Sequence, residues 1–364
     1  MIDQNMKVRL RIAIVLLLGA LATSCSNLPY YLQSMRGQLD VWSRQQDIEA
    51  VIAQPDTPDA LREKLRTVLR VRNFASSELA LPQNASYRSY VNLGRPFVVW
   101  NVFATREFSI EPRQWCFLFA GCVNYRGYFG KADADAFAAD LEARGYDVFV
   151  GGVPAYSMLG YFPDPVLNTF VNYPLPHLAR LVFHELSHQV VYAHDDTEFN
   201  ESFAVTVEQE GLERWLAHFG SAEDRASYEL MRERRADFIN LIETYRNRLD
   251  ALYRAGVPSK VMRAQKADLF AQLHEDYLKL KTGWGGYAGY DRWFAEKPNN
   301  ALLASVAIYT KKVPAFQALL AREGRDLRRF YAAAKSLSRM SKPERTAALE
   351  RLMPAAPGAA ATAH

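Results

Sequence analysis

The residues with the clearest capacity for chemistry are two histidines and a glutamate in one short segment. His184, Glu185 and His188 form the pattern His-Glu-x-x-His within Leu178 to Ala193. On a helix, side chains four residues apart lie on the same face, so both imidazoles can reach one metal ion. Neutral imidazole nitrogen is a preferred zinc ligand, and a neighbouring carboxylate can take a proton from water at the metal. The segment therefore predicts a Zn²⁺ site with Glu185 as general base.

The alternative interpretation of this segment is a solvated helix face with two coincidental histidines. Its flanks, Leu181 to Phe183 and Val190 to Val191, are apolar and place the helix in a core. Because buried polar groups need a partner, histidines on such a helix favour a bound metal. His194, just past the segment, is expected to be a helix-end cation rather than a ligand.

A third ligand is expected downstream, because a catalytic zinc site uses three protein ligands and keeps one position open. Asp195 to Glu198 opens a second helix, with Glu201 in its early turns and Glu208 two turns further on. The short linker makes the two helices fold back antiparallel, which puts Glu201 opposite the histidines. Glu201 is thus the predicted third ligand. Glu208 is a competitor for that role, a carboxylate that hydrogen-bonds a ligating histidine, or a surface residue.

Hydrolysis of a peptide at such a site also needs a donor to the oxyanion and a support for the extended substrate. Tyr287 or Tyr290, in the glycine and aromatic loop from Gly283 to Asp291, could supply the donor, and a purely structural loop is the alternative. Tyr309, in a later helix, is a further candidate. The strand expected at Val148 to Val153 could offer an unpaired edge to which a peptide adds.

The composition describes the chain that must position these residues. It has 364 residues, 49% hydrophobic and 23% charged, which is typical of a folded soluble protein. Disordered chains, collagen-like fibres and multi-span membrane proteins are excluded. The formal net charge of +4 is small for this length, so no nucleic-acid partner is expected.

Residues 1–24 have the layout of a bacterial secretory signal peptide. Three basic residues precede the apolar run Ile12 to Leu21, and small residues then lead to Cys25. At about 1.5 Å per residue, this run is too short for a permanent span of a bilayer about 30 Å thick. The cysteine resembles that of a lipoprotein lipobox, which implies a lipid anchor on Cys25. Ser26 in place of an aspartate favours the outer membrane, facing the periplasm, and simple secretion is the alternative.

Cys116 and Cys122 are the only other cysteines of the chain. A pair in an oxidising compartment predicts a disulfide that closes a short loop. Metal binding by this pair is disfavoured, because its spacing does not match the common zinc patterns and no histidine is adjacent.

The order of patterns along the chain predicts an α+β fold, mainly helical with a small mixed sheet and an active-site helix pair. Helical spacing and strand composition alternate before about residue 174, and helices follow almost without interruption. The expected helices before that point lie at 34–53, 59–81 and 131–145, the strands at 88–130 and 146–153, and a long charged helix follows at 222–254.

One domain is expected to cover residues 25–353. Its parts are N-terminal helices at 25–87, a sheet-containing part at 88–173 and a helical part with the metal site at 174–353. The tail at 354–364 is rich in alanine and has little to pack, so it is expected to be disordered.

Several strings occur in an order that resembles known families. Asn200 to Ala204 is similar to the Asn-Glu-Gly-Phe-Ala of gluzincin aminopeptidases, whose glutamate binds zinc. More closely, the chain resembles the bacterial family of putative aminopeptidases over most of its mature length. The strings that carry this second resemblance are Cys122–Phe129, Gly151–Ser157, Asp164–Thr169, the histidine segment, and Asp196–Glu201.

The resemblance implies a zinc metallopeptidase, a zincin-like helix pair and a peptide substrate. It implies zinc bound by His184, His188 and Glu201, with Glu185 as general base. The chain has no Gly-x-Met-Glu-Asn string of the kind that binds a free N-terminus. An endopeptidase or cell-wall peptide amidase, and an envelope lipoprotein that keeps the zinc without turnover, therefore stand as alternatives to an aminopeptidase.

Overall fold

The computed structural model describes residues 28–117, 121–295, 297–307 and 311–353. The signal segment at 1–24, Cys25, Tyr309 and the tail at 354–364 lie outside the described residues. Within the described ranges, no helix has both the length and the apolar character that crossing a membrane requires.

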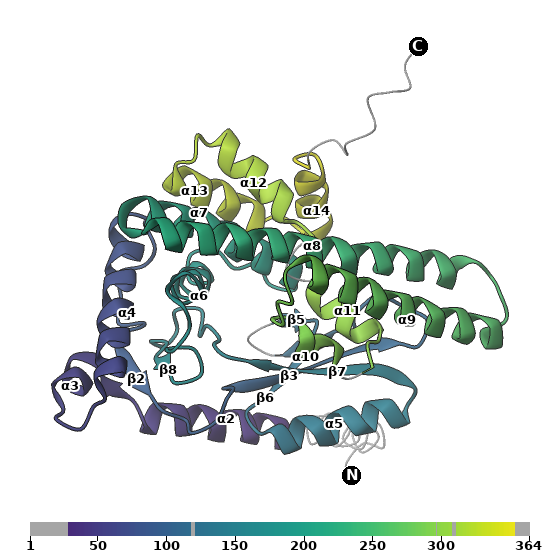
Figure 1. Ribbon diagram of the computed structural model, residues 1–364, viewed down its shortest axis with the longest axis horizontal. Helices are drawn as coiled ribbons and strands as arrows, with labels where there is room; N and C mark the ends of the chain where they lie inside the picture. The colour runs from purple at the N-terminus through teal and green to yellow at the C-terminus, as the bar shows by residue number, and fades with distance from the viewer. Residues whose placement is uncertain (1–27, 118–120, 296, 308–310, 354–364) are drawn as a thin grey trace, which may run out of the picture.

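Helices dominate the described chain and small sheets complete it, which agrees with an α+β fold (Figure 1). The helices are α2 (Leu28–Ser43), α3 (Ile48–Ala53), α4 (Asp59–Ser77), α5 (Lys131–Ala143), α6 (Leu175–Ser187), α7 (Thr197–Phe219), α8 (Ala222–Arg254), α9 (Ser259–Gly283), α10 (Asp291–Phe294), α11 (Asn300–Ala307), α12 (Val313–Arg322), α13 (Leu327–Ser338) and α14 (Lys342–Glu350). The strands are β1 (Gln46–Asp47), β2 (Ser89–Val91), β3 (Val99–Arg106), β4 (Trp115–Phe117), β5 (Gly121–Val123), β6 (Arg126–Tyr128), β7 (Tyr146–Val153) and β8 (Val166–Leu167).

The strands form three small sheets among the described residues, where the sequence predicted a single mixed one. The order β1-β2-β8 makes a mixed sheet, β6-β3-β7 is antiparallel, and β4 pairs with β5. The segment that was expected to be strand throughout is divided by Pro96 and Pro112, which lack the N–H that a strand ladder needs. The β4-β5 hairpin holds the predicted disulfide between Cys116 and Cys122.

β7 is an edge strand in the sheet that it forms with β3. It pairs with β3 over its whole length, from Val99 opposite Val153 to Arg106 opposite Tyr146. No described strand pairs with its other side. Figure 1 shows this sheet between α2 and α5 on one side and the group α8 to α11 on the other.

The first predicted helix is divided in the structure. α2 ends at Ser43 and α3 begins at Ile48, because the Asp47 side chain accepts hydrogen bonds from the amides of Glu49 and Ala50 and so caps a new helix. The predicted helices at 131–145 and 222–254 correspond closely to α5 and α8.

α6 and α7 are the pair of helices that carries the predicted site. The inner face of α6, including Val182, Phe183 and Leu186, is fully buried. Gly211 of α7 lies against the ring of Phe183 and against Leu79, where a Cβ atom would approach within 3.0 Å of both. The glycine therefore permits the close approach of α7 to α6.

The connection between these helices is longer than the sequence predicted, because α6 ends earlier. α6 ends at Ser187 rather than near Ala193, and His188 is its C-terminal cap. The side chain of Asn200 then holds the linker, because it both donates to and accepts from the backbone of Ala193. This pair of hydrogen bonds ties the start of α7 back to the linker.

The start of α7 is fixed by a buried ion pair. Asp196 caps the helix by accepting from the amide of Phe199, and its other oxygen binds Arg345 at 2.9 Å. Lys312 approaches the same carboxylate at 3.2 Å. Burial alone would raise the pKa of Asp196, but Lys312 and Arg345 hold it below the ordinary value.

We expect Asp196→Ala to lower the free energy of unfolding by about 3–5 kcal/mol, because it leaves Arg345 buried without its partner.

Because the pKa of Asp196 is lowered in the folded state, the wild-type pair stabilises the fold at neutral pH and loses that effect as the pH falls below about 4. Thermal and denaturant unfolding would measure both effects. In the matched control, Asp135→Ala breaks the exposed pair with Lys131 and should cost less than about 1 kcal/mol. Equal losses in the two variants would contradict the assignment.

Candidate metal centre

Two histidines from the end of α6 and one glutamate from the first turns of α7 converge at the junction of these helices. Glu201 Oε2 lies 3.2 Å from His184 Nε2 and 3.8 Å from His188 Nε2. One possible ligand atom from each residue lies within 4.8 Å of the others, and all three side chains are largely buried. No other group of three or more such residues stands out in the described ranges.

The spacing of these atoms suits a small cation. Donor atoms about 2.1 Å from a tetrahedral ion lie about 3.4 Å from one another, close to the separations seen here. His188 makes no hydrogen bond with a described residue, and its Nδ1 is buried without a partner. A buried imidazole whose Nε2 faces a carboxylate beyond hydrogen-bond reach would be satisfied by a cation between the two. The nitrogen and carboxylate donors are of the kind that Zn²⁺ prefers.

Glu208 lies behind the cluster and orients one of its members. Its Oε2 is 2.9 Å from His184 Nδ1, so the carboxylate engages the ring nitrogen that faces away from Glu201. Its other oxygen accepts from Arg180 at 3.0 Å and lies 3.5 Å from Arg235. Glu208 is 3% exposed, so the structure does not support the reading as a surface carboxylate.

The pKa values of the two histidines are shifted in opposite directions, one by carboxylate partners and the other by burial. Burial would lower the pKa of His184, but its hydrogen bonds to Glu201 and Glu208 raise it to about 10. Burial lowers the pKa of His188 to about 4. The surroundings of His184 therefore favour a positive charge on or beside its ring. His188 stays neutral, so a nitrogen lone pair of its ring is available to a metal ion. A cation at their junction satisfies both conditions at once.

Glu185 follows His184 on α6 and is partly buried; its pKa is raised to about 8, mainly by desolvation and further by the neighbouring charge of Glu201. Because the carboxylate is in a weakly polar environment, its ionised form is more basic than that of an exposed glutamate. Such a group is able to accept a proton near neutral pH.

Tyr125 is a residue near the cluster for which the sequence suggested no role. Burial raises the pKa of its hydroxyl, and the charges of Glu201 and Glu185 raise it further, so both carboxylates lie within electrostatic range. The hydroxyl therefore remains a donor at neutral pH. One feature of the sequence could have pointed to Tyr125. The residue follows the disulfide hairpin and lies in Cys122–Phe129, one of the strings that carry the family resemblance. Its distance of about sixty residues from the histidine segment hid the connection.

The structure places the two predicted loop tyrosines elsewhere. The guanidinium of Arg234 lies 4.3 Å from the ring of Tyr287, and Tyr290 stacks on Phe238 with ring centroids 4.1 Å apart. No contact described for either tyrosine involves His184 or another member of the cluster. Both instead line a cavity of about 840 Å³ that runs beside β7.

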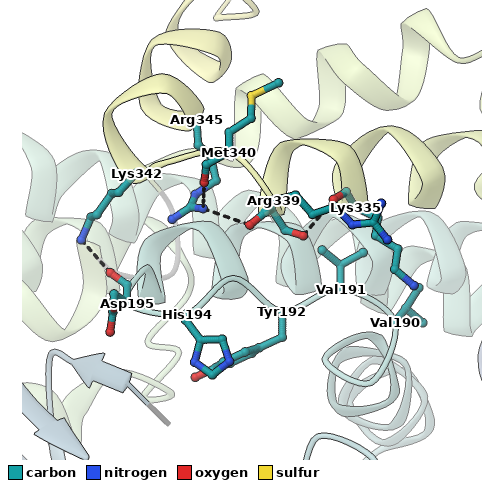
Figure 2. Close-up of a pocket in the computed structure, with 11 residues that line it drawn as sticks. Val190, Val191, Tyr192, His194, Asp195, Lys335, Arg339, Met340, Lys342 and Arg345 are labelled. Atoms are coloured by element: carbon teal, nitrogen blue, oxygen red, sulfur yellow. Dashed lines mark hydrogen bonds between the residues drawn. The ribbon is translucent and has the colours of Figure 1, made fainter. Parts of the chain in front are cut away.

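A second, smaller pocket of about 440 Å³ lies beyond the end of α6. Figure 2 shows His194 in this pocket with its ring against Tyr192, and Lys342 reaching the backbone oxygen of Asp195. His194 is therefore exposed near the helix end and is not part of the cluster.

The comparison with known proteins gives one match. A family whose sequences are described as "Putative aminopeptidase" matches residues 29–349. This range runs from the second residue of α2 to the last but one of α14 and therefore includes the whole candidate site. No curated protein and no solved structure matches the chain.

We expect Glu208→Gln to weaken Zn²⁺ binding by about 10- to 100-fold, because the variant loses the carboxylate that orients and polarises His184. Competition with a chromophoric chelator would measure the dissociation constant. Glu210→Gln is the matched control, since Glu210 is also buried on α7 but pairs with Arg214 and Arg325. A similar loss of affinity in both variants would show that a general loss of stability, and not Glu208, is responsible.

Proposed function

Because the chain belongs to the putative aminopeptidase family, we propose that it is a zinc-dependent metallopeptidase. The family supports a peptidase acting on a peptide substrate. The observation that carries the metal dependence is the convergence of His184, His188 and Glu201 in one buried cluster. We assign these three residues as the zinc ligands and the α6 and α7 pair as a zincin-like active-site scaffold.

The reaction that this site supports is hydrolysis of an amide bond. Bound zinc would polarise the substrate carbonyl and make water more acidic. Glu185 takes the proton from the attacking water and passes it to the nitrogen that leaves. Its place next to His184 on α6 sets it beside the cluster without making it a ligand. Glu208 holds the His184 ring through Nδ1, so the opposite nitrogen stays directed at Glu201.

We assign Tyr125, rather than Tyr287 or Tyr290, as the donor that stabilises the oxyanion. The support for this assignment is that the hydroxyl of Tyr125 is buried and interacts electrostatically with the carboxylates of Glu201 and Glu185. A protonated phenol in a buried site donates strongly to developing negative charge.

The proposed enzyme is anchored in the cell envelope. The layout of residues 1–24 supports export, and Cys25 supports a lipid anchor in the outer membrane that faces the periplasm. The disulfide between Cys116 and Cys122 is consistent with an oxidising compartment of this kind.

An endopeptidase or a cell-wall peptide amidase is the second candidate. The observation that favours it is the basic lining of the cavity beside β7, which includes Arg234 and Arg235 and would repel a free substrate ammonium group. Peptides with a free amino terminus, compared with their N-acetylated forms, separate the two candidates. Equal turnover of both forms would remove the aminopeptidase assignment and leave the metallopeptidase in place.

We expect Glu185→Gln to retain about one zinc per chain while kcat for a responsive peptide falls by about 10³-fold, because only the proton acceptor is lost. Metal analysis and a mass-spectrometric survey of cleaved peptides would measure the two quantities. Glu229→Gln, in an exposed pair with Arg232, is the control and should match the wild type. Retained zinc with no turnover by the wild-type protein on a broad peptide panel would favour a non-catalytic zinc lipoprotein.

We expect Tyr125→Phe to lower kcat by about 10²-fold with a smaller change in KM, because the lost hydrogen bond acts mainly on the transition state. Tyr245→Phe removes a hydroxyl that donates to Asp276 between α8 and α9, and should keep wild-type kcat. Steady-state kinetics on one peptide would compare the two variants. A loss confined to KM in Tyr125→Phe would assign this residue to substrate binding instead.

A further inference from the structure

The cavity beside β7 follows the unpaired edge of the strand. Its lining includes α5 on one face of the sheet and α8, α10 and α11 on the other, so it wraps around this edge. At that edge the carbonyl of Val148 accepts a hydrogen bond from Asn299. Because backbone groups alternate along an antiparallel strand, those of Val150 and Gly152 face the same side. An extended peptide could therefore pair with β7 inside the cavity.

The side chains that line this cavity carry a marked excess of positive charge. Six of them are lysine or arginine and two are acidic. One of the two acids, Asp135, is already paired with Lys131 on α5. The cationic residues that remain are Arg180, Arg234, Arg235, Arg292 and Lys297.

The charge excess is sharpest where the cavity approaches the metal centre. Arg180 and Arg235 share a single carboxylate oxygen of Glu208, whose second oxygen is engaged by His184. The Nε of Arg180 is also buried without a hydrogen-bond partner. One carboxylate therefore serves two guanidinium groups, and one donor remains unsatisfied in the cavity wall.

Arg234 adds a third guanidinium that has no acidic partner among the described residues. It stacks on the ring of Tyr287 and donates to the backbone oxygen of Trp284 at 3.3 Å. Both contacts fix the orientation of the planar group without neutralising it. A guanidinium held in this way is suited to a carboxylate ligand. We call Arg180, Arg234 and Arg235 the basic cluster.

The position of the basic cluster relates it to the bond that would be cleaved. Arg180 precedes His184 by one turn of α6, which is about 6 Å along the helix axis. Two residues of an extended peptide span a similar distance, at about 3.3 Å each. A negative group on the substrate, one or two residues from the reacting carbonyl, would therefore reach the cluster.

From these observations, and resting on the proposed peptidase function, we propose that the cavity beside β7 is the substrate site and that the basic cluster binds a substrate carboxylate. The favoured substrates are acidic peptides that pair with β7 in an extended form. The carboxylate comes either from an acidic side chain or from a free C-terminus, since the same guanidinium chemistry recognises both.

Direct binding tests this proposal without requiring turnover. The probe is a set of four fluorescent peptides of one length, with Glu or Gln at the central position and with a free or amidated C-terminus. Their dissociation constants are measured by fluorescence anisotropy on zinc-loaded Glu185→Gln protein. We expect at least one carboxylate-bearing peptide to bind about 10-fold or more tightly than the Gln amide, and the arm that shows the gain identifies the source of the carboxylate.

Variants connect that preference to the cavity. Arg234→Gln should reduce the advantage of the carboxylate to less than about 3-fold, and Arg234→Glu should reverse it. Arg292→Gln removes a positive charge from the same cavity at an exposed position outside the basic cluster, where poor folding is not expected, and should reduce the advantage by a smaller factor. Arg232→Gln, on the same helix but outside the cavity lining, is the control and should leave it unchanged.

The outcomes separate this proposal from the proposed function. Equal binding of all four peptides, or a preference that survives undiminished in folded Arg234→Gln protein, overturns the carboxylate site. If the wild-type protein still cleaves these peptides, the peptidase assignment stands. Preferential binding of acidic peptides with no cleavage by the wild type would instead contradict the peptidase and support the carboxylate site alone.

Discussion

The structure depends on the burial of an excess of carboxylates at the junction of α6 and α7. Glu185, Glu201 and Glu208 lie around two histidines in a region with little access to water. Buried carboxylates repel one another and lose hydration, so such a group is stable only when positive charge compensates it. Two arginines compensate Glu208 from behind. The remaining negative charge faces His184 and His188, and this is the physical reason to expect a divalent cation there.

The surrounding structure supports this arrangement. The glycine of α7 lets the two helices lie close together. Asn200 ties the linker, at Ala193, to α7, and the ion pair of Asp196 fixes the start of the helix that carries Glu201. The arginines that balance Glu208 have a second consequence. Two guanidinium charges face the single negative charge of Glu208. The excess makes the lining of the neighbouring cavity positive beside the unpaired edge of β7.

The sequence predicted the parts of this site that depend on local spacing. His184 and His188 share a helix face, and the short linker limited where Glu201 could lie, so their convergence followed from periodicity alone. The α+β composition and the β7 strand were also predictable, because hydrophobic pattern and turn residues are local signals. The end of α6 at His188 was not predictable. The apolar residues that follow it continue the helical spacing of the sequence, although they lie in a turn. The role of Glu208 stayed open because its burial depends on Arg180 and Arg235 from two other helices. Tyr125 and the basic cavity come together only through long-range packing, on which single-sequence spacing has no bearing.

The central claim is that one cation is bound where the two histidines of α6 meet Glu201 of α7. Anomalous X-ray scattering at the zinc absorption edge, from crystals of the metal-loaded protein, tests it most directly. The account predicts a single strong peak about 2.0–2.2 Å from His184 Nε2, His188 Nε2 and a carboxylate oxygen of Glu201. A peak elsewhere, or a zinc ion bound by the histidines with Glu201 turned away, would contradict it.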